Sequence, residues 1–112
     1  MAKTQTPTRE RIVSAASRLF YSEGIRAVGD MTGVKIAVEM HPGFVAYNPE
    51  TLLRLREIGG PNVGCNYDPS HMFWQGIDPI EAARFLGQNK CIFHVHAKDC
   101  AIDPGNSRRI GN

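Results

Sequence analysis

The sequence predicts an α/β fold with three parallel strands, and two observations carry this prediction. Three apolar segments, centred near residues 36, 64 and 93, recur every 28 or 29 residues. A helical pattern lies between each successive pair. This order gives two βαβ units, whose right-handed crossovers place parallel strands in one sheet. No GxGxxG or GxxxxGKS/T loop follows a strand, so a dinucleotide or P-loop nucleotide site has little support.

A helix precedes the first strand. Ile12, Ala16 and Leu19 fall on one face of a helix that runs from residue 8 to about residue 23, and Gly24 is its expected C-cap. Residues 1–29 contain five basic and two acidic side chains, which gives a net charge of +3 (5 minus 2), whereas the whole chain has a formal charge of +2. The pattern therefore predicts one basic, amphipathic N-terminal helix.

The two crossover helices have clear start signals. Asn48 can cap the first, with Pro49 in its first turn. The second begins with Asp78, Pro79 and then Glu81, which is the spacing of a capping box. Glycines follow the apolar face of each helix and are expected to end it. The predicted order is strand 34–40, helix 49–58, strand 62–67, loop 70–76, helix 79–87 and strand 91–96.

Composition limits the class of protein. The 112 residues include 42% hydrophobic and 21% charged side chains, without an apolar run long enough to span a membrane or an N-terminal secretory signal. The three cysteines have no CxxC spacing, which disfavours a disulfide framework and a zinc ribbon. We therefore expect one cytoplasmic globular chain. The small net charge does not indicate nucleic acid or an anionic membrane as an obligatory partner.

Polar side chains gather where the predicted strands end. The carboxyl ends of parallel strands face the ligand crevice of α/β proteins, so side chains there can share one cavity. Carboxylates and imidazoles together suit Mn, Zn, Co or Fe better than calcium. Such an ion would polarise a sugar carbonyl and permit isomerisation or epimerisation, although any single histidine is more often solvated than a ligand. The candidate residues are Glu39, His41, Asp68, His71, His94, His96 and Lys98.

Three segments carry a resemblance to a known family. VKIAVEMHP, NVGCNYDPSHMFWQGIDP and IFHVHAKD, within residues 34–109, resemble the sugar phosphate isomerase/epimerase family, the xylose isomerase-like TIM barrels. The resemblance implies a divalent metal such as Mn, Zn, Co or Mg, and a sugar or sugar phosphate substrate. It assigns Glu39, Asp68 and His96 as metal ligands. It further implies that catalytic residues are His71, His41 and Lys98, and that substrate contacts are His94 and Trp74, with Phe73 beside Trp74 in an apolar wall.

The chain is short for such a barrel. A complete (β/α)8 barrel needs about 250 residues, so three parallel strands with two intervening helices form only a sector of one. The family's fourth ligand, a glutamate on the last strand, has no counterpart here. We therefore expect a fragment of a metal-dependent isomerase or epimerase that is inactive alone. We also expect it to self-associate, because both outer strands have open edges.

The N-terminal segment resembles a different family. TPTRERIVSAASRLFYSEGIRAVG is similar to the first helix of TetR-type transcription regulators, which divides the chain into residues 1–30 and a barrel part, residues 31–112. The helix-turn-helix that should follow is replaced by MTGVKIAVEMHP, so sequence-specific DNA binding is not expected. Two alternatives to an enzyme fragment remain, a non-catalytic regulator fragment and a small interaction module. Hydrolase, lyase or dehydratase chemistry also stays open, because a fold does not define a reaction.

Overall fold

Three parallel strands form the sheet of this chain, as the sequence predicts. The structure, a computed structural model, describes residues 8–111, with the side chains of all of them except residues 20–22. The strands are shorter than predicted and lie in the order β1 (Ile36–Glu39), β2 (Val63–Tyr67) and β3 (Ile92–Val95). Ile36 pairs with Val63 across the first ladder. The described residues therefore form an open α/β sheet rather than a closed barrel.

The second ladder contains one irregularity. Cys65 pairs with Ile92, but its neighbour Asn66 pairs with His94, so Phe93 is an extra residue on β3. The Phe93 ring lies beside Gly64, where an added Cβ would overlap both this ring and the carbonyl oxygen of Cys91. A glycine is therefore needed in the middle of β2, and the bulge sets which residues of β3 reach the end of the sheet.

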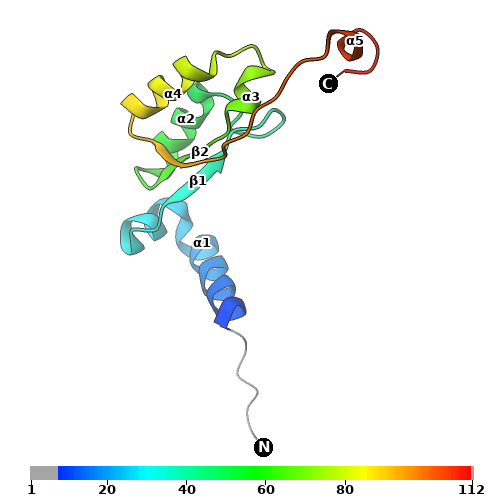
Figure 1. Ribbon diagram of the computed structural model, residues 1–112. Helices are drawn as coiled ribbons and strands as arrows, with labels where there is room; N and C mark the ends of the chain where they lie inside the picture. Colours follow the sequence, from blue (N-terminus) through cyan, green and yellow to red (C-terminus); the bar gives the residue numbers. More distant parts are fainter. Residues whose placement is uncertain (1–7, 112) are drawn as a thin grey trace, which may run out of the picture.

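Helices α2 (Pro49–Gly59) and α4 (Pro79–Gln88) lie on the same side of the sheet (Figure 1). The cap predicted at Asn48 is present and forms a full capping box, since its Oδ1 accepts from the Thr51 N–H and Thr51 Oγ1 accepts from the Asn48 N–H. At α4 the Asp78 carboxylate accepts from two backbone N–H groups. The predicted reciprocal half of that box is wrong, because Glu81 pairs with Arg84 instead.

The core lies between the sheet and these helices. Cys65 and Tyr67 of β2 point toward it, together with Leu52 of α2 and Leu86 of α4, and all four are buried. The alternation along a strand directs Asn66 to the opposite face, the face that would line the interior of a barrel. The three cysteines of the chain, Cys65, Cys91 and Cys100, are free thiols, as their spacing predicts.

The N-terminal helix α1 (Thr8–Thr32) is longer than predicted. Gly24 interrupts it with a φ of 79° and a ψ of 163°, but the helix then resumes instead of ending. Tertiary contact explains the continuation: Val28 is buried, and Gly29 packs so closely on the Asn62 side chain that a Cβ would overlap it. The part before Gly24 stands away from the sheet (Figure 1). Among the described helices, none is both long and apolar enough to cross a membrane.

Candidate metal centre

The carboxyl ends of the three strands bring three potential ligands together. Glu39 is the last residue of β1, Asp68 follows β2 directly, and His96 follows β3 directly. One ligand atom from each lies within 4.8 Å of the other two. The strands are parallel, so their carboxyl ends meet at one edge, and the three residues that meet there are those that the family resemblance assigns as ligands. The geometry is suited to one small cation.

His96 is held between an acid and an amide. Its Nδ1 lies 2.9 Å from Glu39 Oε1, and its Nε2 lies 3.2 Å from Asn66 Nδ2. Glu39 and His96 are half-buried, so solvent and a small ligand can reach them. Asn66 Oδ1 is buried and accepts no hydrogen bond from a described residue. Sequence reasoning missed Asn66, although strand alternation places it on the same face as Asp68.

Asp68 is the most buried member of the cluster, with 2% of its surface exposed. It also caps the short helix α3 (Pro69–Phe73), because its Oδ1 accepts from Ser70 N at 3.0 Å and from Ser70 Oγ at 2.6 Å. The sequence predicts a loop at α3, and Ser70 was not singled out. Burial of the carboxyl raises its pKa, but the Ser70 hydrogen bonds and the Lys98 ammonium outweigh this effect and lower the pKa to about 2.

The other oxygen of Asp68 faces the cluster. Lys98 Nζ lies 2.9 Å from Asp68 Oδ2 and 3.9 Å from Glu39 Oε1. The close carboxylate of Asp68 raises the pKa of Lys98. Although it is paired in charge, Oδ2 is buried and accepts no hydrogen bond of normal geometry from the described part of the chain. A buried carboxylate oxygen needs a positive partner, which is the Lys98 ammonium here, and a metal cation could fill the same role.

His71 approaches the same carboxylates from α3. Its Nε2 is 3.5 Å from Asp68 Oδ2 and 3.7 Å from Glu39 Oε1. Trp74 Nε1 donates to its Nδ1 at 3.2 Å. An indole N–H can only donate, so Nδ1 must accept, and neutral His71 therefore holds its proton on Nε2, facing the carboxylates. Trp74 thus fixes the tautomer of His71, a role that the sequence did not reveal.

His41 stands behind His71 rather than in the cluster. The two rings are 4.3 Å apart between centroids and meet edge to face. His41 Nδ1 lies 2.7 Å from the carbonyl oxygen of Pro42, which can only accept, so neutral His41 carries its proton on Nδ1. Its Nε2 is then free to accept a proton. The side chain is half-buried in the turn after β1.

The remaining candidates border the cluster. His94 is exposed, and its ring centroid is 5.7 Å from that of His96, so both point to the same side of β3. Trp74 and Phe73 are 46% and 44% exposed. Neither side chain is buried in the core, so both can contact a ligand. All of the residues singled out from the sequence therefore lie at this end of the sheet, and three of them form the compact cluster.

Comparison with known proteins shows which family the sequence resembles. The model of the family described as xylose isomerase-like TIM barrel matches residues 6–111. The chain is 56% identical over 69 residues to the uncharacterized protein YfiH of Bacillus subtilis (strain 168), which covers 62% of this chain and 21% of that protein. It is 34% identical over 80 residues to the rhizopine catabolism protein MocC of Rhizobium meliloti, covering 71% and 24% of the two chains.

A third relative has a named activity. The inosose dehydratase of Geobacillus kaustophilus (strain HTA426) is 35% identical over 72 residues, covering 63% of this chain and 23% of that protein. The chain thus spans about a fifth to a quarter of the length of these curated relatives. The family match includes α1, and the comparisons give no support for the TetR-type resemblance of residues 1–29.

Proposed function

This chain belongs to the xylose isomerase-like TIM barrel family, and we propose that it supplies the metal centre of a sugar isomerase or epimerase of that family. The observation that carries the proposal is the convergence of Glu39, Asp68 and His96 within 4.8 Å at the carboxyl edge of the sheet. Two carboxylates and one imidazole suit Mn, Zn, Co or Mg. Three protein ligands leave further coordination positions for water or substrate.

A divalent ion held there would act as a Lewis acid toward the carbonyl and neighbouring hydroxyl of a sugar or sugar phosphate. The chain's own residues would move the protons. His71 carries its N–H on Nε2, close to the cluster, and can donate a hydrogen bond from it to a substrate oxygen. His41 has Nε2 free to accept a proton. The two imidazoles therefore offer a base and a hydrogen-bond donor side by side: His41 could take the proton from the carbon next to the carbonyl and return it to the neighbouring carbon, while His71 holds the oxygen.

The other candidates would bind the substrate. Lys98 already lies against the two carboxylates, and its side chain is 56% exposed, so its ammonium can also reach a hydroxyl or a phosphate oxygen. His94, beside His96, and Trp74, beside His71, would contact the sugar. We propose the same two parts of the chain as the sequence suggests: residues 1–30, and residues 31–112 as the barrel sector that holds the site.

A dehydratase is the second candidate, and the similarity to inosose dehydratase favours it. Isomerisation, epimerisation and dehydration next to a carbonyl can all begin with removal of a proton from the adjacent carbon. The same metal centre and the same acid–base pair would therefore serve each reaction. The products distinguish them, since only dehydration releases water and leaves a new double bond or its keto tautomer.

Metal binding is the direct test. We would titrate Mn²⁺ into the purified 112-residue protein and follow the free ion by electron paramagnetic resonance. We expect one site, and at least tenfold weaker binding in Asp68→Asn and in Glu39→Gln, because each removes a charged ligand. Glu57→Gln, which removes an exposed carboxylate on α2, is the matched control. Equal affinity in Asp68→Asn and the control would refute the proposed centre.

Activity is the second test. The described residues form three strands, whereas a barrel active site is built from the loops of eight, so we expect no turnover by this chain alone. The same substitutions would then be made in a full-length protein that contains this sector, and assayed on aldoses, ketoses and inososes. Retention of full activity by the Asp68→Asn enzyme would contradict the assignment, whichever product is formed.

A further inference from the structure

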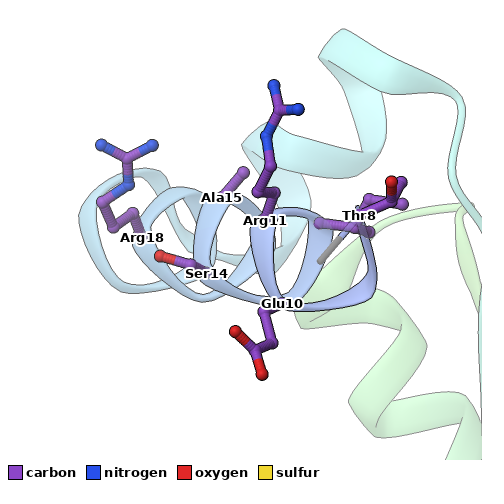
Figure 2. A pocket seen from close by; sticks show the side chains of 7 residues that line it. Thr8, Glu10, Arg11, Ser14, Ala15 and Arg18 are labelled. Carbon is purple, nitrogen blue, oxygen red and sulfur yellow. The ribbon is translucent and has the colours of Figure 1, made fainter. Parts of the chain in front are cut away.

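The part of α1 before Gly24 presents an apolar stripe to solvent. It stands away from the sheet (Figure 1), and Ile12 and Leu19 are 63% and 36% exposed. The hollow beside this stripe is lined by residues of α1 alone, and Figure 2 shows Arg11 and Arg18 pointing to one side of the helix and Glu10 to the other. Ile12 and Leu19 therefore keep much of their apolar surface exposed in the described part of the chain. An amphipathic helix of this kind is stable when its apolar face is buried.

The stripe has the spacing of a helix-pairing seam. Arg9, Ile12, Ala16, Leu19 and Glu23 follow each other at intervals of three, four, three and four residues, the heptad pattern of a coiled coil. Opposite charges stand at its two ends, and each is seven residues from the central Ala16. Ala16 is small, so two helices can approach closely at the middle. The charged residues in Figure 2 lie outside this seam.

We propose that α1 pairs with α1 of a second copy, antiparallel, about a two-fold axis near Ala16. Reversal about this axis places Arg9 of one copy opposite Glu23 of the other, and the symmetry repeats the ion pair at the far end. The apolar residues then meet between the two pairs. A parallel arrangement would bring Arg9 against Arg9 and Glu23 against Glu23. The positions of Arg9 and Glu23 in the seam therefore favour a second copy of the chain as the partner and an antiparallel orientation of the two helices.

Charge reversal tests the direction of pairing. Sedimentation equilibrium of the purified protein should show a monomer–dimer equilibrium. R9E and E23R should each weaken the dimer by about tenfold, because either change turns two exposed ion pairs into two repulsions. The double variant R9E/E23R restores both pairs in reversed order, so its dimer should return to within about twofold of the wild type. R11E makes the same charge change outside the seam and should have no effect.

Three outcomes would overturn the proposal. One is a monomer at every concentration, and another is a double variant that is weaker than either single one. The third concerns the open edges of β1 and β3, which offer a different route to self-association. L19E should abolish pairing through α1 but leave edge pairing intact, so a dimer that survives L19E forms through the sheet. Circular dichroism of each variant verifies that the chain stays folded, and Mn²⁺ binding, which involves none of these residues, should be unchanged.

Discussion

Replacing Asp68 with asparagine should make the stability of the chain much less sensitive to acid. The pKa of Asp68 lies at about 2 in the folded chain, against an ordinary value of 3.8. Burial opposes this shift, and the Ser70 hydrogen bonds together with the Lys98 ammonium overcome it. A difference of nearly two pKa units corresponds to roughly 2–3 kcal/mol, at about 1.4 kcal/mol per unit. That amount is a large part of the stability of a small domain.

The direction of the pKa shift decides how the stability of the folded chain changes with pH. The folded chain has the lower pKa, so ionised Asp68 stabilises it above pH 3.8, and this contribution disappears as the pH falls toward 2. The amide side chain of Asp68→Asn cannot ionise, so the variant lacks this component at every pH. The wild type should exceed Asp68→Asn by roughly 2 kcal/mol more at pH 6 than at pH 2, whatever constant difference the substitution also introduces.

Urea denaturation followed by circular dichroism measures this difference. The series would run between pH 2 and pH 6 with a chelator present, so that no bound ion contributes to the free energy of unfolding. Glu57→Gln removes an exposed carboxylate and should follow the wild type. If the stability curves of the wild type and Asp68→Asn stay parallel across this range, the Ser70 and Lys98 contacts do not hold the carboxylate ionised, and the electrostatic account of the site is wrong.

Two further predictions concern the core. Leu86→Ala should lower the free energy of unfolding by about 2–5 kcal/mol, because Leu86 is fully buried and its truncation leaves a cavity in the core. Urea denaturation would measure this loss. Phe85→Ala is the control, and its loss should be smaller because Phe85 is 44% exposed. A thiol reagent should label Cys100 and spare Cys65 and Cys91 in the folded chain, because burial raises the pKa of both, that of Cys65 to about 12. Mass spectrometry of digested protein would show this, and rapid labelling of Cys65 would contradict it.

Much of the fold could be predicted because its signals are local. Asn48 and Asp78 cap α2 and α4 with their own side chains, and each is followed by a proline, which favours the first turn of a helix. A few neighbouring residues therefore predict where each helix begins. The repeat of apolar strands then fixes the parallel order. This order places all of the strand-end candidates at one edge, and the family resemblance selects Glu39, Asp68 and His96 among them.

The remainder depends on contacts between distant segments. Gly24 is a typical helix end, yet α1 resumes after it, because Val28 is buried and Gly29 packs against the Asn62 side chain. The sequence of residues 25–32 alone does not predict that this part of α1 packs near Asn62. The tautomer of His71 likewise depends on where the Trp74 indole points, and the position of Asn66 beside His96 depends on the bulge at Phe93. Such features arise only when the strands are in register.

The charges of the site connect fold and function. Glu39 and Asp68 lie close together, and two carboxylates at this separation repel unless a positive group stands between them. Lys98 supplies one positive charge at 2.9 Å from Asp68, which leaves a net charge of −1 with neutral histidines. The divalent ion of the proposed function would reverse this to +1, and a positive field of this kind would attract the electron-rich or anionic oxygens of the proposed substrate. The ammonium and the ion would then repel each other, because both would lie against the Asp68 carboxylate.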